Sequence, residues 1–494
     1  MKSSTKNSIK TLLTVILIVC FNIFGYSRQP FRFIVAADGT GDFTSIQAAM
    51  NSCPEGEQSL IFIKNGTYAE QVSLGTKAAS SSKKISLIGE SRDGVVITHS
   101  QSRRGSGSPT FEDICTVKLY ATDFYAENIT IENTAGNTGM AEALYTAGDR
   151  QTFKNCRILG YQDTYRSKKG TRGYFKDSWI EGAVDFIYAG GSLIFDDCTI
   201  NCVKGGGYIT APEDAFAYVS ILNTEIRKTL RLSFLFRNCS ITANEGVPEN
   251  SYYLGRPWNV NAGTFYLNCY LGNHIRPIGW QTWNGNETSA SFAEYNSMDL
   301  SGNPVDVSSR ATWSFQLPKN DVDKYLTPEF FYSKGYTTPY DPISICISPE
   351  APVIISSTND SFSWNPVSNA IGYLIFKNGS FLTVTTNTTY TDNSEEIGTY
   401  SIKSIGNLGV LSDASNVTTD VIITEETNFI KEISKEKISF EKEVDIKLFS
   451  ISGKKISNLR NVNQISTCNI EKGWYVLEVN DNFGLRTKGK VFIY

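Results

Sequence analysis

Two aspartates form the pattern in this sequence that most suggests chemistry. Asp163 and Asp185 lie 22 residues apart, and Gln162 and Phe186 stand next to them in the chain. On neighbouring coils of a repeating β structure, this spacing would place the two side chains about 4.8 Å apart along the axis. Carboxylates that close repel, so one holds its proton to a higher pH than the other, as an acid and a nucleophile require. On spacing alone, two aspartates in local turns are an equally good interpretation.

A recurrent six-residue pattern supports a repeating structure. It runs aromatic or apolar, any residue, Asn or Asp, small or apolar, any residue, Ile or Leu. Its copies are AENITI from Ala126, FKNCRI from Phe153, FKDSWI from Phe175, FDDCTI from Phe195, FRNCSI from Phe236 and YLNCYL from Tyr266. The Asn/Asp positions are separated by 27, 22, 20, 41 and 30 residues, and the longest interval has room for two coils. Such β-rich repeats with weak helical periodicity predict a solenoid of strands, a parallel β-helix.

The same pattern predicts how the solenoid interior is filled and closed. Its fourth position is held by Cys156, Cys198, Cys239 and Cys269, with Ser178 between the first two. Equivalent positions stack inside the coil, so we expect buried core thiols rather than metal ligands. With two histidines and no CxxC pair, no metal site is expected. Near the N-terminus, TSIQ from Thr44 resembles a capping box, which predicts a short helix over the open end.

Composition and the N-terminus indicate a folded, exported protein. The chain has 494 residues, of which 40% are hydrophobic and 19% charged, so several folded domains are expected. A net charge of -4 argues against a nucleic-acid partner. Lys2, Lys6 and Lys10 precede an apolar run from Leu12 to Phe24, which predicts a secretory signal peptide over residues 1–27. The apolar run is too short to span a bilayer comfortably.

Longer motifs around the aspartates resemble the pectin methylesterase family. The strongest matches are GDRQTFKNCRILGYQDTY, YFKDSWIEGAVDFIYAG and YLGRPW, supported by GDFTSIQAAM, GTYAEQV, NITIENTAG, GYITAP and GWQTW. The likeness runs in order from about residue 31 to 340. It implies a right-handed, pectin lyase-like parallel β-helix. It also implies an esterase that hydrolyses methyl esters of homogalacturonan to free galacturonate carboxylates and methanol, with no metal or organic cofactor.

The resemblance implies a role for each matching residue. Asp185 matches the nucleophile, which forms a covalent acyl intermediate, and Asp163 matches the general acid, which later acts as a base. Gln162 matches an amide donor to the oxyanion, and Arg256 matches the arginine that hydrogen-bonds the nucleophile. The implied substrate-binding set is Trp258, Phe186, Tyr161 and Met140.

Met140 is also a departure from the family pattern. The family usually has a glutamine there, in a QAVAL-like segment that is MAEAL in this chain. A thioether cannot donate a hydrogen bond. Either Gln162 and backbone groups suffice, or Glu142 or Tyr145 compensates, or activity is reduced. Tyr188 stands where phenylalanine is more common, a milder change.

Two further segments near the matching motifs stand out. Residues 214–235 diverge from the family, and we expect a protruding loop near the substrate site. A basic run follows the QDT motif, formed by Arg166, Lys168, Lys169 and Arg172. It is interpreted as a solvated loop rather than a site for the free carboxylates of pectin.

Composition changes after Tyr340, which predicts two domains beyond a catalytic β-helix at 28–342. FSWNPVSNAIGYLIFKNG from Phe362 and GTYSIKSIGNLG from Gly398 resemble a fibronectin type III-like β-sandwich, assigned to 343–424 as a spacer or stalk. IKLFSISGKKI from Ile446, GWYVLEV and KGKVFIY resemble the C-terminal sorting domain of type IX secretion cargo, assigned to 425–494. Another small β domain is the alternative for this last segment.

The sequence therefore predicts an all-β bacterial protein that is secreted or held at the cell surface. Its expected partners are pectin and, through the C-terminal domain, the secretion machinery, and we expect a monomer. A non-catalytic polysaccharide-binding β-helix is an alternative that Met140 alone favours. A pectate lyase shares the fold but uses calcium and a basic residue. A Ser-His-Asp esterase is disfavoured, since GxSxG is absent from the sequence.

Overall fold

The computed structural model describes residues 29–107, 109–222, 227–357, 361–392, 394, 399–415, 430–433, 437–450, 454–481 and 486–493. The predicted signal peptide, residues 1–27, lies outside this part of the chain. The described residues belong to two compact units. The first runs to Pro349 and includes Ile405–Leu411, and the second comprises Glu350–Ser404 and the chain from Ser412 onward.

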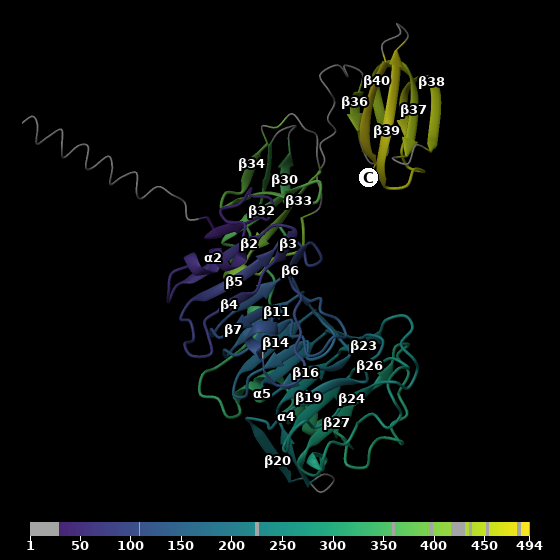
Figure 1. Ribbon diagram of the computed structural model, residues 1–494. Helices are drawn as coiled ribbons and strands as arrows, with labels where there is room; N and C mark the ends of the chain where they lie inside the picture. The colour runs from purple at the N-terminus through teal and green to yellow at the C-terminus, as the bar shows by residue number, and fades with distance from the viewer. Residues whose placement is uncertain are drawn as a thin grey trace, which may run out of the picture. The chain divides into compact units, whose positions relative to one another are not determined.

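Three parallel sheets build the first unit, and the chain visits them in turn (Figure 1). The eleven-stranded sheet contains, in spatial order, β1 (Phe33–Val35), β2 (Gln58–Ile63), β5 (Lys84–Gly89), β8 (Tyr125–Glu127), β11 (Gln151–Lys154), β14 (Arg172–Lys176), β17 (Ser192–Asp196), β22 (Phe234–Arg237), β25 (Gly263–Leu267), β27 (Ser291–Tyr295) and β29 (Phe315–Gln316). The nine-stranded sheet contains β3 (Gly66–Ala69), β6 (Val95–His99), β9 (Thr130–Asn133), β12 (Arg157–Leu159), β15 (Trp179–Gly182), β18 (Thr199–Cys202), β23 (Ser240–Ala243), β26 (Tyr270–Leu271) and β28 (Met298–Asp299). The seven-stranded sheet contains β4 (Val72–Leu74), β7 (Val117–Leu119), β10 (Leu144–Thr146), β13 (Tyr165–Ser167), β16 (Val184–Ala189), β19 (Tyr208–Pro212) and β24 (Tyr253–Gly255).

Each coil adds one strand to a sheet, in parallel register with the coil before it. Phe153 of β11 pairs with Phe175 of β14, and Leu144 of β10 pairs with Tyr165 of β13. Equivalent residues of successive coils therefore stack at the spacing of hydrogen-bonded strands, about 4.8 Å. The parallel β-helix predicted from the sequence is confirmed.

The Asn or Asp of each sequence repeat sits at a sharp corner between the eleven- and nine-stranded sheets. These residues all have positive φ, between 48° and 60°: Asn128, Asn155, Asp177, Asp197, Asn238 and Asn268. Asn and Asp tolerate this left-handed conformation better than other residues with a side chain. Neighbouring corners also bond to each other, since Asn155 Nδ2 donates to Asn128 Oδ1 at 2.7 Å. The Asn or Asp of the sequence repeat thus marks the position at which the chain turns from one sheet to the next.

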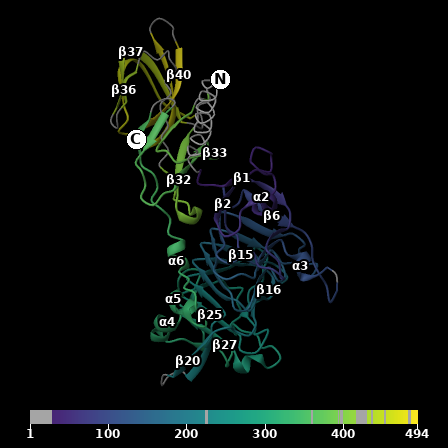
Figure 2. The same cartoon turned by 90° about the vertical axis from the view of Figure 1, so that its left-hand side faces the viewer.

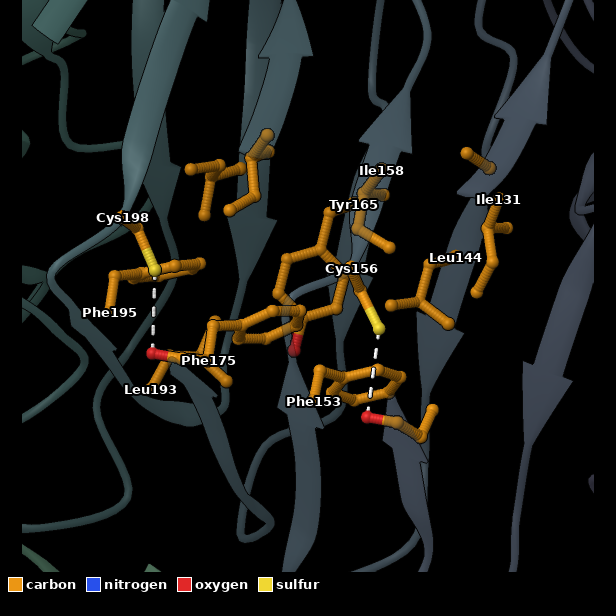
Figure 3. Close-up of a cluster of buried hydrophobic side chains, with 14 of the residues drawn as sticks. Ile131, Leu144, Phe153, Cys156, Ile158, Tyr165, Phe175, Leu193, Phe195 and Cys198 are labelled. Carbon is orange, nitrogen blue, oxygen red and sulfur yellow. Dashed lines mark hydrogen bonds between the residues drawn. The ribbon is translucent and has the colours of Figure 1, made fainter. Parts of the chain in front are cut away.

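The interior of the coil contains stacked rings and thiols (Figure 3). Successive ring centroids lie 4.5 to 5.0 Å apart with nearly parallel planes along Phe153, Phe175, Phe195, Phe236 and Tyr266. Beside them, the thiols predicted to be core residues are buried and unpaired as disulfides: Cys156, Cys198, Cys239 and Cys269. The Cys198 thiol donates to the Phe175 carbonyl at 3.4 Å. That prediction is confirmed.

The short helix predicted near the N-terminus is α2 (Ile46–Ser52), and it covers the first coil. Its buried residues Ile46, Ala49 and Met50 join the interior core cluster. The N-cap is Ser45 rather than Thr44, and the predicted capping box is not formed at Thr44. The Glu70 carboxylate instead accepts from the backbone N–H of Ile46 at 2.7 Å, which a single-segment pattern could not reveal.

The 41-residue interval in the repeat holds one coil and an inserted hairpin, not two coils. β17 pairs directly with β22. In the sequence between these two strands, the chain forms the antiparallel pair β20 (Tyr218–Leu222) and β21 (Arg227–Arg231). Ile221 and Leu230 of this hairpin belong to a second core cluster, on the outer side of the eleven-stranded sheet. The expected loop near the substrate site is therefore, in its described residues, a hairpin packed on a different sheet.

Helices cover the same outer surface. α4 (Lys319–Tyr325) and α5 (Pro328–Ser333) lie beside the later coils near β25 and β27 (Figure 2). Phe331 and Tyr332 of α5 pack in the second core cluster with Ile221 and Leu230. α3 (Phe111–Ile114), α6 (Pro342–Ile345), η1 (Asn286–Ser289) and η2 (Asn407–Gly409) complete the helical segments of this unit among the described residues.

The second unit contains three sheets in its described residues, each with antiparallel strand pairs. Two are three-stranded: β30 (Ile354–Ser357), β31 (Ser361–Trp364) and β34 (Thr389–Thr391), and β33 (Ser380–Thr385), β32 (Gly372–Lys377) and β35 (Tyr400–Ile405). Trp364, Tyr373 and Ile402 pack together between them, as in a β-sandwich. A five-stranded sheet follows, with β36 (Ile430–Ile433), β37 (Lys437–Ser450), β38 (Lys455–Ser466), β39 (Gly473–Asp481) and β40 (Arg486–Ile493). The fibronectin type III-like assignment and the domain limits stay predictions.

The stacked rings predict a large and local stability effect. Replacing the fully buried Phe195 with alanine should lower the free energy of unfolding by about 3–5 kcal/mol, because a cavity opens between two stacked rings. Leu300→Ala is the control, since its side chain is 54% exposed and the expected change is within about 0.5 kcal/mol. Chemical denaturation followed by tryptophan fluorescence measures both. Equal losses in the two variants would contradict the packing analysis.

Candidate active site

The two predicted carboxylates lie side by side on the seven-stranded sheet. Gln162 forms β-bridges with Met140 on the preceding coil and with Val184 on the following one. The residues directly after Gln162 and Val184 are Asp163 and Asp185, so the two aspartates occupy equivalent positions on adjacent coils. Both have positive φ, 61° and 47°, and each is 8% exposed. The 22-residue spacing therefore does bring the two carboxyls together.

A β-bulge and a glycine shape the chain at Asp185. On β16 and β19 the register runs from Val184↔Tyr208 to Ile187↔Thr210, so β16 contains one extra residue there. Bulges of this kind interrupt the ladder and redirect a side chain. A Cβ atom at Gly182 would lie 2.2 Å from the Phe186 Cβ, so only glycine permits this close packing. The bulge therefore turns the Asp185 side chain away from the direction that a regular strand would give it.

Arg256 binds Asp185 through two hydrogen bonds. Its Nε donates to Asp185 Oδ1 at 2.9 Å and its Nη2 donates to Oδ2 at 2.6 Å. The guanidinium carbon lies 3.6 Å from the Tyr208 ring centroid and 4.0 Å from that of Trp283. A two-point contact clamped between aromatic faces fixes both the charge and the orientation of the carboxylate.

The two aspartates differ in electrostatic environment. Burial raises the pKa of the Asp163 carboxyl well above its ordinary value, and the negative charges of Asp185 and Glu142 raise it further. Burial also raises the pKa of Asp185, but the hydrogen bonds and positive charge of Arg256 act in the opposite direction. Among the described residues, no arginine or lysine forms an ion pair with Asp163. Asp163 is therefore the carboxyl expected to hold its proton to the higher pH, while Arg256 favours the ionised form of Asp185.

The other predicted site residues differ in their exposure and in their contacts. Gln162 is partly exposed next to Asp163, and Met140 lies across the bridge from it on the preceding coil. Trp258 is 43% exposed, and its ring meets that of Tyr188 with centroids 5.9 Å apart. Tyr161 is partly exposed and donates through its hydroxyl to the Lys204 carbonyl at 3.1 Å.

Phe186 is a correction to the predicted substrate-binding set. Its side chain is fully buried in the interior core cluster. Because the bulge turns Asp185 out of the ladder, the next side chain packs beneath it, against Gly182. Phe186 therefore supports the bulge of β16 that carries Asp185 and has no open face for a sugar ring.

The basic run after the QDT motif is only in part a solvated loop, since Lys168 and Lys169 are exposed between β13 and β14 but the two arginines are not in a loop. Arg166 belongs to β13, and its Nε lies 2.9 Å from Glu142 Oε1. Arg172 is almost wholly buried in β14, where it pairs with Asp149 and donates to the Thr338 carbonyl at 2.7 Å. That interpretation was wrong for both arginines, because parallel pairing places them on strands and supplies their partners from distant segments.

Sequence reasoning assigned no site role to Tyr208 or Trp283, the rings around Arg256. Both lie inside motifs that carried the family resemblance, GYITAP and GWQTW, which was the available signal. Glu142 was considered only as a substitute for the missing glutamine.

No group of three or more His, Cys, Asp or Glu residues suited to a metal ion occurs in the described part of the chain. No described helix is long and apolar enough to cross a membrane.

Known proteins resemble this chain in the region that contains the site. Pectinesterase 31 of Arabidopsis thaliana is 34% identical over 309 residues, which cover 60% of this chain and 90% of that protein. Pectinesterase 4 of the same plant is 32% identical over 283 residues, and the chain spans 46% of its length. The solved structure of pectin methylesterase from carrot matches with a TM-score of 0.53 and 28% identity, over 62% of this chain and 93% of that one.

Two family models match separate parts of the chain. Residues 433–494 match the Secretion system C-terminal sorting domain, in agreement with the resemblance seen in the sequence. Residues 32–334 match the Pectinesterase model, which includes both carboxylates, Gln162 and Arg256. The chain therefore belongs to the pectinesterase family.

Proposed function

We propose that this protein is an exported pectin methylesterase that hydrolyses methyl esters of homogalacturonan and releases methanol. The observation that carries the proposal is the pair of buried carboxyls on adjacent coils, of which Asp185 alone has an arginine partner. Family membership supports a carboxylic ester hydrolase as the enzyme class. The C-terminal sorting domain supports export to the cell surface or the medium. The monomeric state stays a prediction.

The first half of the reaction uses the difference between the two aspartates. The ionised Asp185 attacks the ester carbonyl carbon, and the negative charge develops on the carbonyl oxygen within reach of the Gln162 amide. When the tetrahedral intermediate collapses, the carbon–methoxy bond breaks and Asp163 gives its proton to the departing oxygen. Methanol leaves, and the galacturonate acyl group is bound to Asp185 as a mixed anhydride.

The second half restores the enzyme. Asp163 is now ionised and takes a proton from a water molecule, whose oxygen attacks the anhydride carbon. The bond to Asp185 breaks, which restores the original protonation states of both aspartates and gives a galacturonic acid group, which then releases its proton to water as the free carboxylate forms. The freed Asp185 carboxylate again accepts the two hydrogen bonds from Arg256. Trp258 supplies a partly exposed aromatic face suited to sugar C–H groups.

Met140 limits the donors available to the oxyanion. Its bridge partner Gln162 is the amide at this level of the sheet, and a thioether on the neighbouring coil cannot add a second donor. We infer that Gln162 provides the main side-chain stabilisation of the oxyanion in this chain.

Methanol release from highly methylated pectin tests the aspartate pair. Asp163→Asn and Asp185→Asn should each lower kcat by at least about 10³-fold, because one lacks a transferable proton and the other a charged nucleophile. Asp177→Asn is the matched control, an aspartate with the same left-handed backbone at an outer corner of the coil. Release should persist in EDTA without an unsaturated product. EDTA-sensitive formation of that product would favour the lyase, and activity in Asp185→Asn would remove the proposed nucleophile.

The oxyanion role of Gln162 predicts opposite effects at two bridged positions. Gln162→Ala should lower kcat by about 10²–10³-fold with little change in KM, because the donor acts mainly in the transition state. Met140→Gln should raise kcat by placing a second amide on the neighbouring coil. Gln58→Ala, on β2 of another sheet, is the control. A loss confined to KM in Gln162→Ala would assign this residue to substrate binding instead.

The protonated state of Asp163 predicts how stability varies with pH. The pKa of an unfolded aspartate is near 3.9, and that of Asp163 in the fold is raised. The stability contributed by its proton is thus fully present below about pH 3.9 and is lost as pH rises through the folded pKa. Asp163→Asn, a mimic of the protonated side chain, should raise the thermal midpoint near neutral pH, and the gain should shrink toward pH 4.

Asp185→Asn provides the comparison by differential scanning fluorimetry. It leaves the partly buried Arg256 without its counter-charge, so its gain should be smaller or become a loss. A gain for Asp163→Asn that is the same at both pH values would show that Asp163 is ionised in the fold.

A further inference from the structure

A third buried carboxyl lies beside the two aspartates. The backbone N–H groups of Ala141 and Ala143 donate to the carbonyls of Gln162 and Thr164 on the next coil, at 3.0 and 2.8 Å. These bonds flank Glu142 and place it beside Asp163. The Asp163 N–H in turn donates to the Val184 carbonyl one coil further. Glu142, Asp163 and Asp185 therefore lie on three consecutive coils, as a column of carboxyls in which the charges of the outer two both act on Asp163.

Glu142 is held by groups from two other strands. Its side chain is fully buried, and its Oε1 accepts a hydrogen bond from the Tyr188 hydroxyl of β16 at 2.5 Å. Arg166 Nε of β13 lies 2.9 Å from the same oxygen, an ion pair without the alignment of a full hydrogen bond. Glu142 Oε2 is buried and has no hydrogen-bond partner in the described part of the structure. This carboxyl is thus oriented but not fully neutralised.

The Arg166 guanidinium is fixed in its turn. It lies 3.7 Å from the Tyr145 ring centroid and 5.2 Å from that of Phe111. This arrangement parallels the clamp of Arg256 between Tyr208 and Trp283. The two outer carboxyls of the column therefore each face an arginine that stacks on aromatic rings, while the central one, Asp163, faces a carboxyl on either side.

We propose that Glu142 is a positioning residue for the general acid: its carboxylate, oriented by Tyr188 and balanced by Arg166, favours the protonated form of Asp163. This inference rests on the proposed esterase function. A negative neighbour on each side makes the neutral state of the central carboxyl the favoured one. Because the Glu142 side chain reaches the reaction only through Asp163, its role is separate from bond making.

The titration of Glu142 itself fits this role. Burial raises its pKa to about 7 against the opposing charge of Arg166, so its negative charge is present above neutral pH. The three carboxyls titrate as a coupled set, so the pH limits of activity belong to the column as a whole. The charged and titratable groups that face Glu142 are Arg166 on β13, Tyr188 on β16, Tyr145 on β10, Glu112 on α3, Cys115 after α3, and Asp163.

The pH profile of kcat/KM for methanol release tests the inference. In Glu142→Gln the alkaline limit should move to lower pH by about one unit or more, because a negative neighbour is lost and Arg166 remains unbalanced. Glu294→Gln is the matched control. Glu294 is a fully buried carboxyl paired with Arg310 at 2.7 Å, but it lies on β27 of the eleven-stranded sheet. Its alkaline limit should stay at the parent value.

A double variant keeps the inference testable if the single variant Glu142→Gln fails to fold. Glu142→Gln with Arg166→Met leaves no unbalanced arginine, which favours folding. Its alkaline limit should also fall, but by less, because Arg166 itself acts to lower the pKa of Asp163. Alkaline limits at the parent value in both Glu142 variants, with methanol still released, would overturn the inference. No release by the parent protein would refute the esterase function, and the inference would fall with it.

Discussion

Hydrogen bonding between adjacent coils determines which side chains become neighbours at this site. The bridges from Met140 through Gln162 to Val184 align three coils, and every group with a proposed chemical role is positioned relative to them. Side chains alternate between the two faces of a strand, so a slip of one residue would bury the polar set and expose the apolar one. The interior rings and thiols prevent that slip, because they pack only in one register. The same strand register therefore determines both the stability of the coil and the geometry of the site.

The site concentrates charge where burial makes charge costly. Three carboxyls and two guanidinium groups lie close together, and each arginine pairs with one of the two outer carboxyls, Glu142 and Asp185. Aromatic rings cover both guanidinium groups without removing their charge. Two chemically identical aspartates have different surroundings, because only Asp185 receives an arginine, which favours its ionised form. Covalent catalysis by a carboxylate needs that asymmetry, since the nucleophile must be charged when the acid is not.

Other parts of the first unit pack on the eleven-stranded sheet rather than on the sheet that carries the site. The β20–β21 hairpin enters between two coils but packs on the outer side of the eleven-stranded sheet with α5. Arg172 ties β14 to the segment after α5 through the Thr338 carbonyl. Insertions on that side leave the seven-stranded sheet in register. The antiparallel sheets of the second unit have cores of their own.

Several features of this protein follow from the sequence by itself. Asn and Asp at the corners, apolar residues between them and the recurring interval were enough to predict a parallel β-helix, since each is a local requirement of the coil. The same interval paired Asp163 with Asp185, and the motifs around them indicated the family. The rings of Tyr208 and Trp283 around Arg256, the burial of Phe186 and the contact of Glu142 with Arg166 were decided only by the tertiary structure. Bulges shift side chains by one position, and counter-charges come from distant coils, so protonation and exposure depend on folded surroundings that residue type and spacing do not contain.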